Sequence, residues 1–414
     1  MFDSRQNVKK IFVIFLIAFF AKVSSFFIFN HGRDIQIFEY EYIAKNLLAG
    51  EGFLYNFGGT SYRAFVQPFY PVFTAVIYYF TNSSHIAMMI IQCFISSLLC
   101  FIVYSIALRL TGEKEAFWAA AISVFHPGLT VYSIFKLHPL VFDTFFYLLT
   151  VALILRLFRS FGNKNALLIG IVSGFALLSR STIIPFLLFV VTFIFFMPGK
   201  IRFKTRYRYI VIICLSAFLI YLPWLVRNYR VFKGFVFMQT CSGENLWVGN
   251  NSAASGSAIL KSGESIHTKM PSEIHDSLMN LDELNQVKYY KEYFMNFIKK
   301  QPFLFLGLFL KKFYYFWWFS PHTGILYDES WLFIYKIYYR IIALFFGIGF
   351  ISVLKDRQKY PVLLTIFCYM VSLSIVHAIV NVDTRHRWTV EPLMIIFAVI
   401  GLSKFFNYFK YSKC

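Results

Sequence analysis

Three acidic residues stand where a carboxylate could take part in proton transfer. Asp34 and Glu39 follow an apolar stretch that ends near residue 30, and Asp143 begins another such stretch four residues after Pro139. A carboxylate at such an edge could orient or deprotonate a hydroxyl group. Two structural alternatives remain open, because Asp34 can be a solvated partner of Arg33 and Asp143 can cap a helix N-terminus.

Basic side chains beside other apolar stretches favour the binding of an anion. Arg385, His386 and Arg387 are consecutive and lie between two apolar stretches, and Arg180 lies between two more. Guanidinium groups bind phosphate oxygens in a bidentate manner, so these residues predict a phosphate site. The alternative is that the arginines extend towards lipid headgroups.

The composition predicts that these residues are positioned by membrane-spanning helices. Of the 414 residues, 58% are hydrophobic and 14% are charged, which is more apolar surface than one soluble core can bury. Only helices or closed barrels satisfy their backbone groups in lipid, and a helix needs ~20 apolar residues to cross. We predict an all-α polytopic membrane protein with about ten transmembrane helices, at 11–30, 86–108, 116–135, 140–158, 166–180, 182–198, 208–226, 332–354, 360–380 and 388–406.

The basic loops predict the orientation of these helices. With the N-terminus inside, every short basic loop falls on the cytoplasmic side, as the positive-inside rule requires. The stretches 66–80 and 302–319 are short and broken by proline or lysine, which favours interfacial helices. We therefore expect a multi-pass protein of the cell (plasma or inner) membrane with both termini in the cytoplasm.

This topology divides the chain into three parts. We expect an N-terminal transmembrane module (1–226) whose first outer loop (31–85) is catalytic, a mixed outer-face segment (227–330) and C-terminal transmembrane helices (331–414). The net charge of +20 comes largely from short loops, so the basic residues indicate topology and lipid headgroups rather than nucleic acid.

The outer-face segments supply further candidate substrate contacts. The stretch from Gly243 to Asn250 contains glycines that permit close backbone approach, and its polar and aromatic side chains suit a sugar. It could instead be a structured turn that packs on the membrane. The candidate substrate-binding residues are Tyr40, Arg63, His138, Glu244, Asn245, Trp247 and Asn250.

Taken in order, these residues resemble a known family. The chain is similar to the GT-C superfamily of polyprenyl-phosphate-sugar glycosyltransferases, especially bacterial family 39 proteins related to protein O-mannosyltransferases and to the lipid A aminoarabinose transferase. The matching pieces run along nearly the whole chain: Asp34, Glu39-Tyr40, 43–53, 68–71, Leu178-Ser179-Arg180, 223–229, 243–250, Arg385-His386-Arg387 and Glu391-Pro392.

The resemblance implies a catalytic acid in the first outer loop and a second acid after the third span. Asp143 beside Thr144 matches the second acid. The first acid usually stands about four residues before the tyrosine, where this chain has Gln36, so Asp34 and Glu39 both remain candidates for the base, with Asp34 slightly preferred.

The function that the resemblance implies is transfer of a sugar from a polyprenyl-phosphate donor to a lipid, glycan or protein acceptor at the outer face, with inversion. Arg180, Arg385, His386 and Arg387 would stabilise the leaving phosphate, and Asp143 would position the acceptor.

Metal dependence and one other function class remain open. Asp34 and Asp143 could share a divalent metal ion, although no cluster has clear ligand spacing and no cofactor is otherwise expected. The alternative function is a flippase or transporter of lipid-linked sugars. A flippase should place charges deep within several spans, whereas most charges here lie at span edges.

Overall fold

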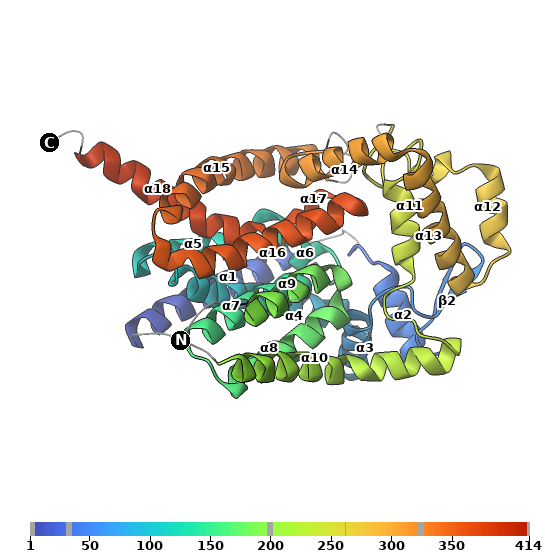
Figure 1. The fold of residues 1–414 in the computed structure, drawn as a ribbon, viewed down its shortest axis with the longest axis horizontal. Coiled ribbons are helices and arrows are strands. Elements are labelled where there is room, and N and C mark those ends of the chain that lie inside the picture. Colours follow the sequence, from blue (N-terminus) through green and yellow to red (C-terminus); the bar gives the residue numbers. More distant parts are fainter. Residues whose placement is uncertain (1–4, 30–34, 197–201, 261, 321–326, 412–414) are drawn as a thin grey trace.

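The computed structural model of the chain is almost entirely helical (Figure 1). It describes residues 5–29, 35–196, 202–260, 262–320 and 327–411. Seven helices in these ranges are long and apolar enough to cross a membrane. They are α1 (Arg5–Phe29), α4 (His85–Ala107), α7 (Leu140–Arg159), α10 (Phe203–Phe232), α15 (Glu329–Leu354), α16 (Tyr360–Ile379) and α18 (Glu391–Tyr411). The chain is therefore a multi-pass membrane protein.

The count of ten spans is not confirmed. The predicted span 116–135 is two helices, α5 (Glu113–Val124) and α6 (Pro127–Phe135), bent by 41° at a break before Pro127. This bent pair is the eighth candidate span. The predicted spans 166–180 and 182–198 are the shorter helices α8 (Asn163–Ser179) and α9 (Ile184–Phe196), the latter preceded by the turn η1 (Ser181–Ile183).

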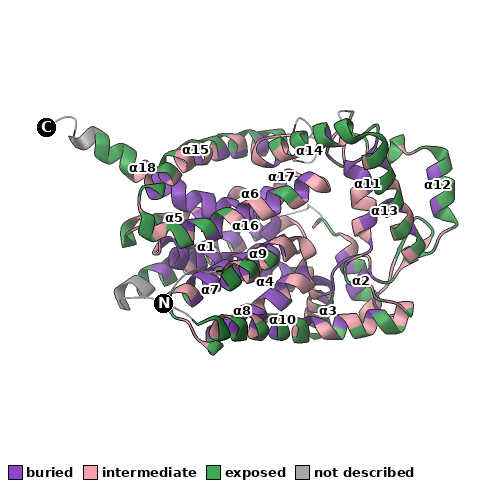
Figure 2. Ribbon diagram, viewed as in Figure 1, coloured by how far each residue is buried: buried purple, intermediate pink, exposed green. Residues whose placement is uncertain are grey.

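The helical bundle is buried at its centre and apolar on its outside. Figure 2 shows buried residues along α4 and α7, and exposed residues along α10 and α15 at opposite edges of the view. The exposed side chains include Leu215 and Leu219 of α10, and Ile341 and Leu344 of α15. Such surfaces suit contact with lipid tails.

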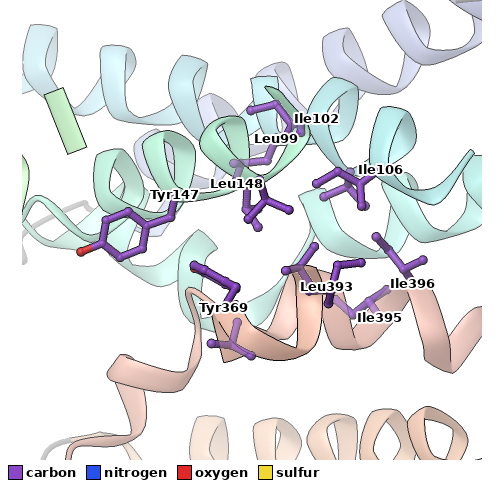
Figure 3. Close-up of a cluster of buried hydrophobic side chains, with 14 of the residues drawn as sticks. Leu99, Ile102, Ile106, Tyr147, Leu148, Tyr369, Leu393, Ile395 and Ile396 are labelled. Carbon is purple, nitrogen blue, oxygen red and sulfur yellow. The ribbon is translucent and has the colours of Figure 1, made fainter. Parts of the chain in front are cut away.

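The core joins early helices to late ones. In the buried cluster drawn in Figure 3, Leu99 of α4 and Leu148 of α7 lie near Tyr369 of α16 and Leu393 of α18. Small residues let two helix pairs approach closely. A Cβ atom on Gly170 of α8 would lie 1.8 Å from the Ser216 Oγ of α10, and one on Gly349 of α15 would lie 1.8 Å from a backbone oxygen of α18.

The remaining elements gather at the right-hand end of Figure 1, opposite the end where α1 begins and α18 ends. They are α2 (Glu39–Leu48), a hairpin of β1 (Tyr55–Phe57) and β2 (Thr60–Tyr62), α3 (Phe69–Thr81), α11 (Cys241–Gly249), η2 (Ile266–Lys269), α12 (Ser272–Met279), α13 (Glu283–Lys300) and α14 (Pro302–Trp317). The stretches predicted as interfacial helices correspond to α3 and α14.

One buried carboxylate joins the segments 31–85 and 227–330. Glu283, in the first turn of α13, accepts hydrogen bonds from the backbone N–H groups of Arg63 (2.5 Å) and Ala64 (2.9 Å) and from the Thr240 hydroxyl (2.6 Å). The loop 31–85 and the segment 227–330 therefore pack together. Two further short elements, η4 (Arg357–Lys359) and α17 (Thr384–Arg387), precede α16 and α18.

Candidate functional site

The chain after the first span is held against the turn between α6 and α7. The Gln36 N–H donates to the Phe135 carbonyl (2.9 Å), and the Leu137 N–H donates to the Gln36 carbonyl (3.0 Å). This short parallel bridge places Glu39, the first residue of α2, on the side of the bundle where His138 lies. Asp34, the other candidate base, lies outside the described residues.

Asp143 is fully buried in the first turn of α7, where its carboxylate fixes an arginine. It accepts a hydrogen bond from the Ser179 hydroxyl (2.6 Å) and an ion-paired hydrogen bond from the Nε of Arg180 (2.7 Å). It makes no side-chain cap on its own helix, so the capping alternative does not describe this geometry. Both oxygens have protein partners, while only the Nε–H among the five N–H donors of Arg180 has a side-chain partner among the described residues.

Arg385 and His386 stand on the four-residue helix α17. Asp383 caps this helix and pairs with the Arg385 Nε (3.3 Å), while the Arg385 Nη1 donates to the Tyr132 hydroxyl (3.3 Å). The His386 Nδ1 accepts the Asp383 N–H (3.1 Å), which leaves the ring proton on Nε2 as a donor. The His386 ring also stacks on His377 with 3.8 Å between centroids.

The candidate residues come from separate parts of the chain and act on one another. His138 packs edge-on against Tyr40, with ring centroids 5.6 Å apart. Burial raises the pKa of Glu39, and the positive charges of Arg385 and Arg180 oppose that rise. Burial also lowers the pKa of His138, with help from both arginines. The half-buried Glu39 carboxylate is therefore within electrostatic range of two cations, and the same two cations act on the neutral imidazole of His138.

The His386 imidazole has the same electrostatic character. Burial lowers its pKa well below the ordinary value, and the charges of Arg385 and Arg180 lower it further. The ring is therefore neutral near pH 7, with one N–H available to a ligand.

Arg387 does not share this position. It is fully buried, its Nε donates to Glu391 (2.7 Å), and its terminal amino groups donate to the Phe316 carbonyl (3.1 Å) and the Tyr335 hydroxyl (2.8 Å). Its guanidinium also packs on the Tyr339 ring, 3.6 Å from the centroid. The structure uses Arg387 to hold protein groups, so we leave it out of the phosphate site.

Sequence reasoning missed the partner that completes this buried network. His126, at the break between α5 and α6, bonds through Nε2 to Glu391 (2.6 Å), and its Nδ1 accepts the Leu129 N–H (3.1 Å). Both side chains of the pair are fully buried. The sequence offers a signal only in the His126-Pro127 pair, which marks a helix break.

The outer-segment candidates form a helix rather than a turn. On α11, Glu244 pairs with His267 (2.8 Å) and remains partly exposed, and Asn245 accepts a hydrogen bond from Asn381 (3.0 Å). Trp247 is buried in a hydrophobic cluster with Ile266 and Tyr290. These contacts leave Glu244 as the α11 candidate with an exposed polar group.

Asn250, just after α11, has a structural environment. It is fully buried and accepts a hydrogen bond from the buried ammonium of Lys312 (2.8 Å). Its amide donates to the Ile379 carbonyl (2.9 Å), and a Cβ atom on Gly249 would lie 1.7 Å from the Val380 oxygen. Close packing against the end of α16 explains the glycine at position 249.

Arg63 directly follows β2. Its side chain is exposed, and its backbone carbonyl accepts a hydrogen bond from Arg227. Across the described residues no group of three or more His, Cys, Asp or Glu side chains is arranged to hold a metal ion. Asp143, one half of the predicted metal pair, already has both oxygens engaged.

Part of the chain matches a protein-family model. Residues 66–226 match the model described as dolichyl-phosphate-mannose-protein mannosyltransferase. This stretch includes Asp143 and Arg180 but neither Glu39 nor Arg385. No curated protein sequence matches the chain.

The fold has counterparts among solved structures. The oligosaccharyltransferase of Archaeoglobus fulgidus in its apo form matches with a TM-score of 0.58 and 12% identity, over 97% of this chain and 51% of that one. The same organism's oligosaccharyltransferase AglB, in complex with an inhibitory peptide and a dolichol-phosphate, matches with a TM-score of 0.54 and 12% identity, over 99% and 51%. The chain thus spans about half the length of these proteins.

A weaker likeness is to ArnT from Cupriavidus metallidurans bound to undecaprenyl phosphate, with a TM-score of 0.46 and 11% identity, over 95% of this chain and 76% of that one. The family match and the shared oligosaccharyltransferase fold confirm the resemblance to GT-C proteins that the sequence predicts.

Proposed function

We propose that the chain is a membrane glycosyltransferase that moves a sugar from a polyprenyl-phosphate donor to an acceptor hydroxyl at the outer face of the membrane. The observation that carries this proposal is that Arg180 and Arg385 act electrostatically on both Glu39 and His386, which groups a carboxylate with anion-binding side chains. The dolichol-phosphate in the archaeal oligosaccharyltransferase complex supports a lipid-phosphate ligand for this fold.

Each group has a role in a single displacement. Glu39 accepts the proton of the acceptor hydroxyl as its oxygen forms a bond to the anomeric carbon. The bond from that carbon to the phosphate oxygen breaks, and its electron pair stays on the phosphate. Arg180, Arg385 and the Nε2–H of His386 stabilise the charge that develops there. Attack opposite the leaving group inverts the anomeric configuration.

The geometry of Asp143 supports a positioning role. Its carboxylate holds the Nε of Arg180, which leaves the terminal amino groups of the guanidinium to approach the phosphate. Glu39 is our choice of base because burial raises its pKa towards the operating pH, which favours proton abstraction. Asp34 is the competing base and is included in the experiment.

The charge distribution argues against the flippase alternative. Among the described residues of the long helices, Asp143 and Glu391 are buried charges in first turns, and Lys22 is the buried charge that lies away from a helix end. Lys22 donates to the Ser96 hydroxyl of α4 (2.6 Å). A polar path through several spans would need more such groups.

The test is a transfer assay on purified protein with radiolabelled polyprenyl-phosphate hexoses or pentoses and a membrane lipid extract. We expect Glu39→Gln to reduce transfer by about 10²-fold or more while donor binding persists. Glu51→Gln, which changes an exposed acid of the same loop, is the matched control. Loss in Asp34→Asn but not in Glu39→Gln would move the base to Asp34.

Full transfer in both the Asp34 and the Glu39 variants would refute the proposed chemistry. Donor binding without transfer to any acceptor, in wild-type protein, would favour the flippase.

A further inference from the structure

Lys136 ends α6 beside the proposed phosphate site. It lies on the bridge to Gln36 and two residues before His138. Its side chain is half-buried, and its Nζ lies over two aromatic rings, 4.8 Å from the centroid of Tyr132 and 5.1 Å from that of Tyr327. The ammonium is thus held in place by ring faces rather than by an anion.

The lysine differs from its cationic neighbours in having no counter-ion. Arg180 is paired with Asp143 (2.7 Å) and Arg385 with Asp383 (3.3 Å). Within the part of the chain that the structure describes, Lys136 makes no ion pair. The carboxylates that neutralise the two arginines therefore do not neutralise the charge of Lys136.

Tyr132 connects Lys136 to the site. The lysine lies over the ring of Tyr132, and the hydroxyl of the same ring accepts a hydrogen bond from Arg385 (3.3 Å). The His138 and Tyr132 rings pack nearly perpendicular to each other, with 5.1 Å between centroids. Lys136 is also one of the three charges, after Arg385 and Arg180, that help burial to lower the pKa of His138.

We propose that Lys136 is a third cation of this site and binds the phosphate of the lipid-linked donor. This assignment rests on the proposed function. A polyprenyl-phosphate sugar is a phosphodiester with one negative charge, and the departing phosphate gains a second charge when the sugar–oxygen bond breaks. The arginines are already paired with carboxylates, so the unpaired ammonium supplies the charge that complements this gain.

A purely structural role is the competing explanation. A cation at a helix C-terminus is stabilised by the helix dipole, and the contacts with Tyr132 and Tyr327 could serve only to fix the turn. The two explanations differ in whether replacing the lysine changes the affinity for a phosphate-bearing ligand.

The experiment measures binding of undecaprenyl phosphate and of undecaprenol to the purified full-length protein in detergent. We expect Lys136→Met to weaken undecaprenyl phosphate binding about tenfold and to leave undecaprenol binding unchanged. Lys136→Arg should bind within about threefold of wild type, because it keeps the charge. Lys311→Met, which removes an exposed lysine that lies over Tyr315 (5.8 Å), is the matched control.

The comparisons between variants and ligands distinguish an error in the Lys136 assignment from an error in the proposed function. Equal binding of undecaprenyl phosphate by wild type and Lys136→Met overturns the assignment of Lys136 and leaves the proposed function standing. Wild-type protein that binds undecaprenyl phosphate no better than undecaprenol overturns the proposed function itself. Competition by excess phosphatidylglycerol or inorganic phosphate that matches undecaprenyl phosphate identifies a general phosphate site and overturns the donor assignment. Lys136→Gln replaces the methionine variant if the latter does not fold.

Discussion

Arg385 and Arg387 stand two residues apart, and the structure predicts opposite consequences when each is replaced. Arg387 and Glu391 are fully buried and paired at 2.7 Å. Removal of one partner from a buried pair costs about 3–5 kcal/mol, since it leaves the other charge unpaired. Arg387→Met also leaves the Phe316 carbonyl without this donor. We therefore expect the free energy of unfolding to fall by at least about 3 kcal/mol.

Arg385→Met should change stability far less. The side chain of Arg385 is 30% exposed, and its protein partners are the Tyr132 hydroxyl and Asp383, each at 3.3 Å. A partly exposed pair with this long separation contributes about 1 kcal/mol, much less than a fully buried pair. Its loss should instead weaken the binding of undecaprenyl phosphate, which Arg387 does not contact in our proposal.

The measurement is unfolding in mixed micelles of mild detergent and SDS, followed by tryptophan fluorescence. The double variant Arg387→Met with Glu391→Gln tests the mechanism, because it removes both buried charges together. We expect it to be more stable than the sum of the two single losses predicts, by a coupling energy of about 1–3 kcal/mol. If Arg387→Met alone does not accumulate as folded protein, recovery of folded protein in the double variant is the readout.

Equal stability of Arg385→Met and Arg387→Met would refute this reasoning. Additive losses in the double variant would also contradict it, because the buried pair would then not be energetically coupled.

Three further predictions concern the site, the topology and the outer segment. The transfer rate should rise with pH through a pKa above the ordinary glutamate value, because burial raises the pKa of Glu39 and its ionised form is the base; a profile through an ordinary carboxyl pKa would contradict this. A cysteine at the exposed Ser277 should react with a membrane-impermeant maleimide in intact cells, whereas one at the exposed Ser160 should react only after lysis. The reverse result would show that the predicted orientation in the membrane is wrong. Glu283→Gln should lower the midpoint of thermal unfolding by the equivalent of about 1–3 kcal/mol, while the exposed Glu292→Gln should have little effect. Equal midpoints would refute the stabilising role of the hydrogen bonds between Glu283 and the backbone at residues 63 and 64.

Apolar length was sufficient to predict most of the helices but not their breaks. The stretch 116–135 has the composition of one span, yet the chain bends by 41° where His126 caps the second helix. The helix α8 is shorter than the seven clear candidates and ends at Arg180, whose side chain meets Asp143. Hydropathy does not report such a side-chain contact between residues 37 apart.

The sequence could not separate Arg385 from Arg387 because it did not indicate a helical turn at 384–387. On a helix, residues two apart point about 200° away from each other, so the two guanidinium groups face different surroundings. The same limitation affects Asn250, whose polar side chain suits a sugar in the sequence and a buried lysine in the structure. Residue type indicated which chemistry each side chain could perform, and local backbone geometry determined which groups it contacts.

The cationic side chains of this bundle fall into two groups, according to how many of their N–H donors already form hydrogen bonds within the protein. Arg387 and Lys312 are fully buried, and protein oxygens accept hydrogen bonds from their N–H groups. Each side chain therefore links neighbouring helices. Arg180 and Arg385 keep N–H groups without a hydrogen-bond partner among the described residues, and those donors are available to a ligand. A phosphate bound by such groups depends on the planar fork of the guanidinium as well as on its charge. Arg180→Lys and Arg385→Lys should therefore weaken phosphate binding although both preserve the charge.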